Sequence, residues 1–267
     1  MSSQANVPDR SCLLAVDIGN TNIHLGIWYE GEWRYNWRAR TVHDKMPDEY
    51  AALIRNFLRD REMNFDSISD VVIASVVPSL TTAFAELSLT YIEVDPLIVS
   101  SQINTGIKVD VDHPEMVGAD RIVNAAAVHR LYGGPAIVID FGTATTFDVV
   151  AVNGDYIGGS IAPGIGISLD ALVGRTAQLY KVKLEPPANP IGRNTSEAIQ
   201  SGMFWGYVGL VEGLVARIRA ALPATPEVKI IATGGLAPLF RQHTNVIQAI
   251  APYLTLDGMR IIYDLNR

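Results

Sequence analysis

The sequence predicts an α/β protein of two similar domains, each a mixed β-sheet flanked by helices, with a cleft between the two domains. First, an apolar run that ends in Asp-x-Gly occurs twice, at 13–19 and at 136–142. Second, strand-like and helix-like segments alternate along the chain. Third, 267 residues with 48% hydrophobic side chains suffice for two domains that each have a core.

The first repeat predicts a β-hairpin over residues 13–28. The apolar residues 13–16 favour a buried strand that delivers Asp17 to its end, and Gly19 opens a tight turn. Apolar residues from Ile23 onward predict an antiparallel return strand. Turn chemistry alone also selects Asn and Gly, so an ordinary hairpin is the alternative interpretation of this stretch.

Further elements complete a first domain that is expected to span residues 1–117. Aromatic and polar side chains alternate over 32–40, which is typical of a half-buried third strand. Pro47 lies at the start of a predicted helix, and Ser79 is a suitable N-cap for another. Two more strands are expected, at 70–77 and 98–100.

A second domain is expected over residues 118–267. After a surface connection at 104–116, a helix is predicted from Gly118 until Gly133 and Gly134 end it. The second hairpin, a third strand, the longest helix, a late strand and a tail are predicted at 136–155, 156–161, 196–222, 229–232 and 260–263. We expect the tail to be a last strand or disordered. Because the longest helix is apolar on every side around 203–211, we expect it to be buried between layers or pressed against a second subunit.

The composition excludes several classes of function. The net charge is −7 and no run of Lys or Arg occurs, so no nucleic-acid partner is expected. Residues 1–10 lack a signal-peptide pattern, and no apolar run approaches the ~18 residues of a membrane span. We therefore expect a cytoplasmic protein without a membrane partner. The single cysteine, Cys12, cannot form an internal disulfide, and the histidines show no zinc-ligand spacing.

Both hairpin tips carry small polar residues after the aspartate. Backbone N–H groups and hydroxyls at such tips can cradle phosphates from two sides, and a strand-end aspartate can hold a magnesium ion through water. An Ala-Asp-Arg at a helix start (119–121) and a Gly-Gly before a late helix (234–235) join this pattern. Together they predict a nucleotide cleft. For Asp120 and Arg121 alone, an aspartate on the helix dipole beside a solvated arginine is the alternative interpretation.

Motifs across nearly the whole chain resemble those of the type III pantothenate kinases, in the same order. The matching segments are Asp17-Ile-Gly-Asn-Thr-Asn, Gly118-Ala-Asp-Arg, Asp140-Phe-Gly-Thr-Ala-Thr-Thr-Phe-Asp, Gly158-Gly-Ser-Ile-Ala-Pro-Gly, Arg175-Thr-Ala-Gln-Leu, Gly192-Arg-Asn-Thr and Thr233-Gly-Gly-Leu. That family shares a superfamily with acetate and sugar kinases, actin and heat-shock chaperone ATPases. The resemblance implies two actin-like (ribonuclease H-like) domains. It also implies ATP-dependent phosphorylation of pantothenate to 4′-phosphopantothenate, the first step of coenzyme A biosynthesis.

The resemblance also implies residue roles at matching positions. Asp120 would be the general base, and Arg121 would clamp the carboxylate of pantothenate. Asp17 would bind magnesium through water, and Asp140 would bind a monovalent cation, K+ or NH4+. The implied ATP-binding residues are Asp17, Ile18, Gly19, Asn20, Thr21, Asn22, Ile23, His24 and Thr143. The implied substrate-binding residues are Gly118, Ala119, Asp120, Arg121 and Thr195.

Three further points complete these expectations. Asp148 matches the family pattern but lies beyond the hairpin tip, which favours a structural hydrogen bond over catalysis. Val111 stands where family members commonly carry a tyrosine of the substrate pocket, which keeps open a nucleotide-binding regulator with impaired catalysis. An actin-like filament or a chaperone ATPase is disfavoured because the chain is short and lacks a client domain. The apolar stretch 204–211 and the resemblance both point to a homodimer, with ATP and pantothenate as small-molecule partners.

Overall fold

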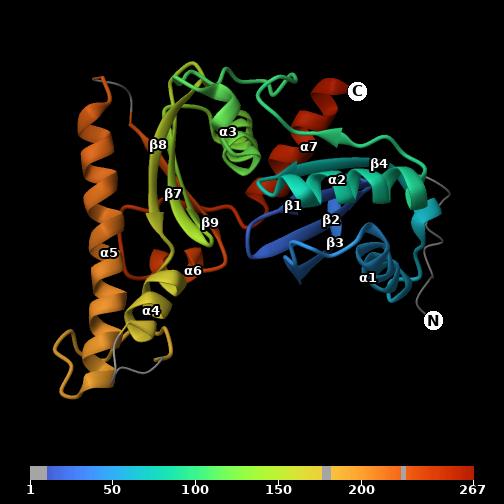
Figure 1. Ribbon diagram of the computed structural model, residues 1–267. Helices are drawn as coiled ribbons and strands as arrows, with labels where there is room; N and C mark the ends of the chain where they lie inside the picture. The colour runs from blue at the N-terminus through green and yellow to red at the C-terminus, as the bar shows by residue number, and fades with distance from the viewer. Residues whose placement is uncertain (1–10, 176–181, 224–226) are drawn as a thin grey trace, which may run out of the picture. The chain divides into compact units, whose positions relative to one another are not determined.

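Both predicted hairpins are present in the computed structural model, which describes residues 11–175, 182–223 and 227–267 (Figure 1). The internal contacts of the chain divide it into two compact units, Met1–Ala127 with Leu254–Arg267, and Val128–Tyr253. Each unit contains one five-stranded mixed sheet. Two mixed sheets with helical cover confirm the predicted α/β class.

The sheet of the first unit has the strand order β3–β2–β1–β4–β5. Its strands are β1 (Cys12–Ile18), β2 (Asn22–Tyr29), β3 (Glu32–Arg40), β4 (Ile68–Ser75) and β5 (Leu97–Ile98). Tight turns make β1, β2 and β3 antiparallel neighbours, and Glu30 and Gly31 in the second turn have φ values of 50° and 85°. Because helix α1 (Pro47–Arg59) crosses over between β3 and β4, β4 returns parallel to β1.

Helices supply apolar residues to two cores of this unit. Alternate residues of β1, including Leu14, Val16 and Ile18, pack with α1 and with α2 (Pro78–Leu87), which continues as the π-helical segment η2 (Ser88–Ile92). The other residues of β1, including Leu13 and Ala15, pack with α3 (Ala119–Tyr132) and α7 (Leu254–Asn266). Two short 3₁₀ segments complete the unit, η1 (Phe65–Ser67) and η3 (Pro114–Met116). Both faces of the sheet are therefore covered.

The C-terminal tail is a helix, so the predicted strand or disorder at 260–263 is wrong. Leu256, Met259 and Ile262 recur at helical spacing, and all three are fully buried in the core beside β1. A Cβ added to Gly26 of β2 would lie 2.8 Å from Leu256 Cδ1. The absence of a side chain at Gly26 thus leaves the space that α7 occupies.

The sheet of the second unit repeats the first one strand for strand, in the order β8–β7–β6–β9–β10. Its strands are β6 (Ala136–Phe141), β7 (Ala144–Val150), β8 (Tyr156–Pro163), β9 (Lys229–Gly234) and β10 (Ala249–Ile250). Its helices are α4 (Ile165–Gly174), α5 (Thr195–Ala221) and α6 (Ala237–Arg241). β6 pairs antiparallel with β7 and parallel with β9, as β1 does with β2 and β4. The shared topology agrees with the duplication that the sequence predicts.

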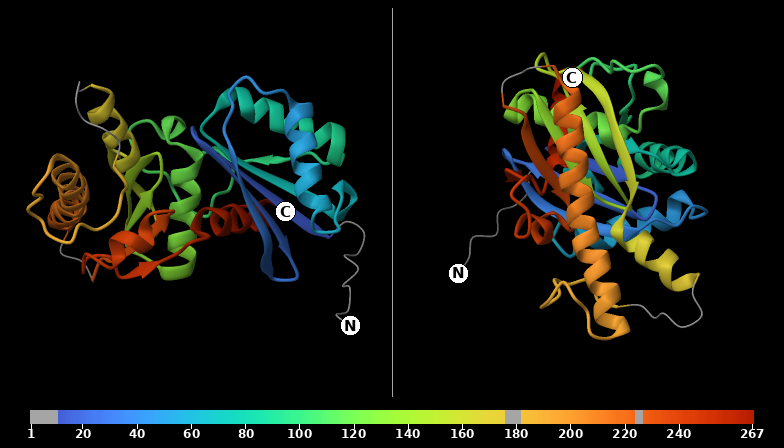
Figure 2. Two further views of the ribbon diagram at one scale, coloured as in Figure 1. Left: turned by 90° about the horizontal axis from the view of Figure 1, so that it is seen from below. Right: turned by 90° about the vertical axis from the view of Figure 1, so that its left-hand side faces the viewer.

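Helix α5 is buried on one side only. Its residues Phe204, Tyr207 and Val211 pack in a core with Ile137 and Ile139 of β6. Its glycines Gly202, Gly206 and Gly209 are exposed, and a Cβ added to any of them would meet nothing within 4 Å. Figure 2 (right) shows α5 along the outside of its unit. Burial of the whole helix between layers, one of its two predicted environments, is therefore not observed.

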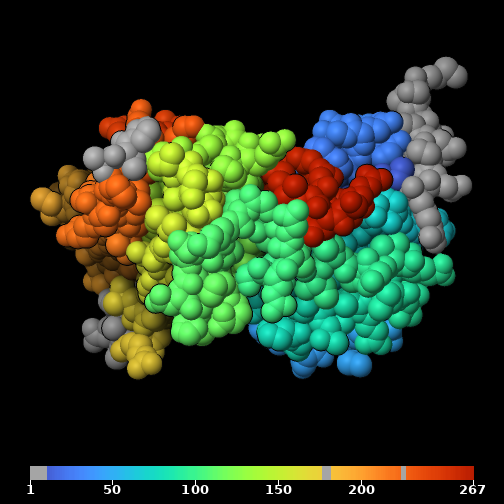
Figure 3. Space-filling view, turned by 90° about the horizontal axis from the view of Figure 1, so that it is seen from above, coloured from blue at the N-terminus to red at the C-terminus, as the bar shows by residue number. Residues whose placement is uncertain are grey.

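The division into compact units falls inside α3, between Ala127 and Val128, and assigns α7 to the first unit. In the space-filling view, α7 (red) forms part of the surface of that unit (Figure 3). The predicted domain bounds, 1–117 and 118–267, stay a prediction. Among the described helices, none combines the length and the apolar character that crossing a membrane requires.

Candidate active site

The first hairpin turn brings together all eight residues predicted to bind ATP at 17–24. Gly19 N–H donates to Asn22 O (3.0 Å) inside the turn. Thr41, which follows β3, holds the turn from outside: its hydroxyl donates to Gly19 O (2.6 Å) and its N–H donates to Thr21 O (2.9 Å). Thr41 is only 8% exposed, so this double contact is shielded from water. Sequence reasoning did not identify Thr41.

Asp17 and His24 face each other across this hairpin. They are direct partners in the β1–β2 register, and Asp17 is half-buried. His24 Nε2 is buried and has no hydrogen-bond partner within the described part of the chain. Burial and the positive charge of Arg38 lower the pKa of His24, and a hydrogen bond with Asn36 partly opposes them. A neutral imidazole therefore lies beside the Asp17 carboxylate.

Gly118 directly precedes α3, and Ala119, Asp120 and Arg121 form its first turn. Asp120 Oδ1 accepts a hydrogen bond from Arg121 N–H (2.9 Å) and lies so close to Gly118 that an added Cβ there would be 2.5 Å away. Burial raises the pKa of Asp120, and the Arg121 hydrogen bond and charge partly offset this. A carboxyl group with a raised pKa accepts a proton more readily than an ordinary aspartate.

Val76 lies between the end of β1, which carries Asp17, and the segment that begins at Gly118 and carries Asp120. Its N–H donates to Ile18 O (3.1 Å), at the end of β1, and its Cγ1 would lie 3.1 Å from a Cβ on Gly118. The turn after Asp17 and the segment that carries Asp120 therefore meet the same residue at one edge of the first sheet. Local sequence patterns gave no indication of Val76.

In the second unit, Asp140 ends β6 and the predicted glycines pack closely around it. Gly142 N–H donates to Ala144 O (3.0 Å), and Gly164 N–H donates to Thr143 O (3.1 Å). Gly234 has a φ of 87°, and an added Cβ would lie 2.7 Å from Asp140 Oδ1 and 2.6 Å from Phe141 O. This explains the first glycine of the Gly-Gly motif, because only glycine fits this conformation and this space.

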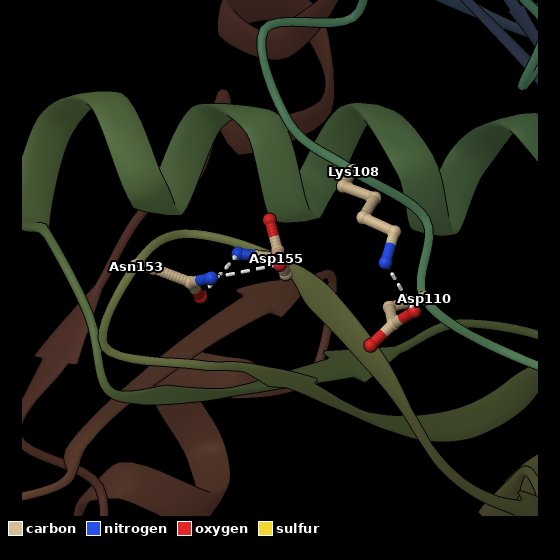
Figure 4. Close-up of polar contacts among 4 residues, drawn as sticks. All are labelled: Lys108, Asp110, Asn153 and Asp155. Carbon is tan, nitrogen blue, oxygen red and sulfur yellow. Dashed lines mark hydrogen bonds and ion pairs between the residues drawn. The ribbon is translucent and has the colours of Figure 1, made fainter.

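Asp148 is fully buried and held by hydroxyl groups, as expected for a structural residue. Thr146 Oγ1 donates to Asp148 Oδ2 (2.9 Å), and the Tyr156 hydroxyl donates to Asp148 Oδ1 (3.2 Å). The neighbouring turn, 151–155, closes locally: Asn153 Nδ2 donates to Asp155 Oδ2 (2.8 Å), as Figure 4 shows. Figure 4 also shows Lys108 paired with Asp110 (2.7 Å) in the first unit.

The predicted substrate-binding residue Thr195 and the predicted pocket position Val111 lie in other elements of the structure. Thr195 is exposed at the start of α5, where Asn194 caps the helix by accepting from Glu197 N–H (3.0 Å). Val111 is half-buried in the loop before η3. Of the matching segment 175–179, residues 176–179 lie outside the described residues.

Cys12 is fully buried in β1, and burial raises the pKa of its thiol, which disfavours a reactive role.

The described residues offer donor groups for metal ions at the two aspartates that lie near the ends of β1 and β6. Among the described residues, no cluster of three or more His, Cys, Asp or Glu side chains is present. Magnesium in kinases is bound by one or two carboxylates, water and the phosphates of the substrate, so it requires no such cluster. Asp17 with the unpartnered His24 nitrogen suits a hydrated ion. Asp140 Oδ1 and Phe141 O, both close to Gly234, are oxygen donors of the kind that hard cations prefer.

Comparisons with known proteins give one consistent result. The family model described as type III pantothenate kinase matches residues 13–217. The type III pantothenate kinase of Roseiflexus sp. (strain RS-1) is 48% identical over 255 residues, which cover 96% of this chain and 99% of that protein. The type III pantothenate kinase of Dehalococcoides mccartyi (strain CBDB1) is 46% identical over 255 residues, which cover 96% of each chain. The structure of an inorganic polyphosphate/ATP-glucomannokinase from Arthrobacter sp. strain KM superimposes with a TM-score of 0.50 and 15% identity, over 97% of this chain and 100% of that one, and supports the predicted fold. The chain therefore belongs to the type III pantothenate kinase family.

Proposed function

We propose that Asp120 is the general base of this enzyme and that Asp17 and the turn after it bind the magnesium–ATP complex. The chain is a kinase of coenzyme A biosynthesis that phosphorylates pantothenate to 4′-phosphopantothenate with ATP. Phosphoryl transfer requires mainly alignment of the reactants, charge neutralisation and a group that receives the proton of the attacking alcohol. The proposal assigns these tasks to named residues.

One observation carries the assignment of Asp120. The Asp120 carboxyl lies against Gly118, Gly118 lies beside Val76, and Val76 N–H bonds to Ile18 O next to Asp17. Burial also raises the pKa of the Asp120 carboxyl. An alcohol close to Asp120 could transfer its proton to the carboxylate as the oxygen attacks the terminal phosphate of ATP. Because basicity increases with pKa, burial makes Asp120 a stronger base than a solvated aspartate.

Neighbouring residues would position pantothenate. Arg121 carries a planar guanidinium that can hold both oxygens of the substrate carboxylate. Gly118 and Ala119 offer backbone without bulk beside it, and Thr195 would add a hydroxyl contact. Val111 would leave the substrate pocket with an aliphatic wall where related enzymes have a tyrosine.

Metal ions fit two places. Asp17 would hold magnesium through water, with His24 Nε2 as an acceptor for one such water, and the ion would neutralise charge on the phosphates. Asp140 would hold K+ or NH4+, and Thr143 would contact the nucleotide phosphates. The oxygens of Asp140 and Phe141 beside Gly234 support this second assignment.

A homodimer in the cytoplasm is part of the proposal. The exposed face of α5 carries Gly202, Gly206 and Gly209, and glycines at this spacing allow another helix to approach closely. A second copy of the chain is the partner that the apolar character of residues 203–211 favours. Light scattering of the purified enzyme would give the molar mass that tests this.

The central experiment is an assay of Asp120→Asn with MgATP, potassium and pantothenate. We expect kcat to fall by about 10²- to 10⁴-fold, the usual contribution of a general base. Asp110→Asn is the matched control, because Asp110 is an exposed aspartate paired with Lys108, and it should retain wild-type activity. Full activity of Asp120→Asn would exclude Asp120 as the base. ATP binding by the wild-type enzyme without any turnover would favour the impaired regulator.

A further inference from the structure

Three facing residues form a row across the first sheet, at the end that carries the first hairpin turn. Asp17 of β1 pairs with His24 of β2, and His24 pairs with Arg38 of β3. Residues that pair directly across antiparallel strands have their side chains on the same face. The adjacent row contains Gly26 and is covered by Leu256 of α7. Arg38 therefore projects on the face of Asp17, one row beyond the α7 contact.

Arg38 has surroundings that differ from those of Arg34 on the same strand. Arg34 forms ion pairs with Glu32 (2.7 Å) and Glu30 (3.6 Å). Arg38 is exposed, and in residues 11–175, 182–223 and 227–267 no carboxylate pairs with its guanidinium. A guanidinium keeps its positive charge and its five N–H donors at any physiological pH. Arg38 is thus a cation that is available to an anionic ligand.

His24 supplies a second unsatisfied group in the same row. Its buried Nε2 lacks a hydrogen-bond partner among the described residues. Buried polar atoms are nearly always satisfied, so a missing partner indicates water or a ligand. The positive charge of Arg38 contributes to the lowered pKa of His24, which places the guanidinium close to the imidazole. The row therefore contains one exposed cation, Arg38, and one buried nitrogen without a partner among the described residues, His24 Nε2.

We infer that Arg38 binds the phosphate groups of the nucleotide and so contributes to nucleotide affinity in addition to the first turn. The inference rests on the proposed function in one respect, the placement of ATP at that turn. A guanidinium can donate two parallel hydrogen bonds to one phosphate, which a solvated lysine cannot do. The contribution should increase with the number of phosphates, because each one adds negative charge.

Calorimetric titration of nucleotides in the absence of pantothenate tests this inference. We expect Arg38→Gln to bind ATP about 10- to 100-fold more weakly than wild type, the effect of losing a charge-assisted hydrogen bond. The loss should be smaller for ADP and smallest for AMP. Arg38→Lys, which keeps the charge but not the fork, should lie between wild type and Arg38→Gln. Arg34→Gln is the matched control and should bind ATP within about twofold of wild type, because Arg34 is paired on the surface.

Equal ATP affinity of Arg38→Gln and Arg34→Gln would overturn the inference, and so would a loss that is the same for ATP and AMP. Thermal melting checks that both variants are folded. If Arg38→Gln does not fold, Arg38→Lys becomes the test, and an ATP affinity of Arg38→Lys equal to that of wild type would overturn the inference. Failure of the proposed function has a different signature. In that case Asp120→Asn would keep full activity, while the titration would still decide the role of Arg38.

Discussion

The two hairpins share one topology and differ in the groups that face their aspartates. The first turn contains residues 19–21 and the second residues 142–143. Asp17 is opposite His24, whereas Asp140 is opposite Thr146. Asp17 therefore has the His24 imidazole beside it and the Arg38 guanidinium one strand further away. Asp140 instead has the Thr146 hydroxyl and the Phe141 carbonyl oxygen nearby. A duplicated fold can thus offer one site suited to a hydrated ion with phosphates and one suited to a bare monovalent cation.

The supports of the two turns also differ. A side chain holds the first turn, because the Thr41 hydroxyl donates to Gly19 O (2.6 Å). A close backbone contact supports the second, because Gly164 N–H donates to Thr143 O (3.1 Å) and a Cβ on Gly164 would lie 2.2 Å from that oxygen. The first turn can therefore be loosened by a substitution that changes no backbone conformation, whereas the second depends on its glycines.

The largest expected effect is that of Gly234→Ala in the second unit. The new Cβ would meet Phe141 O at 2.6 Å and Asp140 Oδ1 at 2.7 Å, in a backbone conformation with a φ of 87°. We expect a loss of about 2–4 kcal/mol in the free energy of unfolding, from overpacking and backbone strain. If Asp140 holds K+ as proposed, activation by K+ should weaken as well, because Asp140 would have to move. Urea denaturation and the potassium dependence of kcat measure the two effects.

Gly19→Ala in the first turn is the counterpart that sharpens this comparison. Its Cβ would lie 3.1 Å from Asn22 O, and φ there is not in the left-handed region. We expect about 1 kcal/mol or less of destabilisation. If the two alanine variants were equally unstable, the claim that only the second turn depends on glycine packing would be wrong.

A smaller effect is expected for Thr41→Val, which removes the side-chain support of the first turn. The variant keeps the shape of the residue and the N–H bond to Thr21 O but loses the hydroxyl bond to Gly19 O. We expect about 1 kcal/mol of lost stability, together with a raised KM for ATP and an unchanged KM for pantothenate. Steady-state kinetics with each substrate varied in turn measures the difference.

Thr81→Val is the control for that variant. Thr81 also donates its hydroxyl to a backbone carbonyl, that of Val77 in α2 (3.1 Å), but it does not contact the turn. It should lose comparable stability with no change in KM for ATP. A similar rise in KM in both variants would show that general loosening of the first unit, not support of the turn, explains the kinetics.

The hairpins and the polar residues at their tips could be predicted because the information is local. An apolar run, Asp-x-Gly and small polar residues are adjacent in sequence, and their repetition distinguishes them from an ordinary turn. Order along the chain then matched a family, which placed Asp120 and Arg121 at a helix start where the structure has them. The register that puts Arg38 beside His24 also follows from two consecutive hairpins, although it requires the lengths of both turns.

The residues that were missed act over long sequence distances. Val76 matters because β4 lies parallel to β1, a pairing that a helical crossover creates and no local pattern encodes. Thr41 is 22 residues from Gly19, and its role depends on where β3 ends. Residues 260–263 alone do not reveal the C-terminal helix, because its apolar period runs through Leu256, Met259 and Ile262. The surface on which α7 packs includes Gly26 of β2, which lies near the other end of the sequence.

The buried carboxylates provide the last comparison between the units, and the smallest expected effect. Asp148 accepts hydrogen bonds from two hydroxyl groups, whereas the bond of Asp120 to Arg121 N–H does not fully offset its burial. Because burial raises the pKa of Asp120 above its ordinary 3.8, the folded state binds a proton more tightly than the unfolded chain does. The stability that this group contributes is complete below pH 3.8 and is lost as the pH rises through the raised pKa. The ionised carboxylate is thus unfavourable to folding at neutral pH.

Asp120→Asn should therefore be more stable than wild type at pH 7, and its free energy of unfolding should decline less between pH 4 and pH 7. Urea denaturation at several pH values measures this, with Asp110→Asn, which changes an exposed carboxylate, as the control that should gain nothing. An unchanged pH dependence in Asp120→Asn would mean that burial of Asp120 does not destabilise the fold. If the gain is observed together with the loss of kcat, the first unit retains a carboxylate that opposes folding because the reaction requires it. Asp148→Asn should instead be less stable than wild type, because an amide has one oxygen and cannot accept from both hydroxyl donors in the way that the carboxyl does.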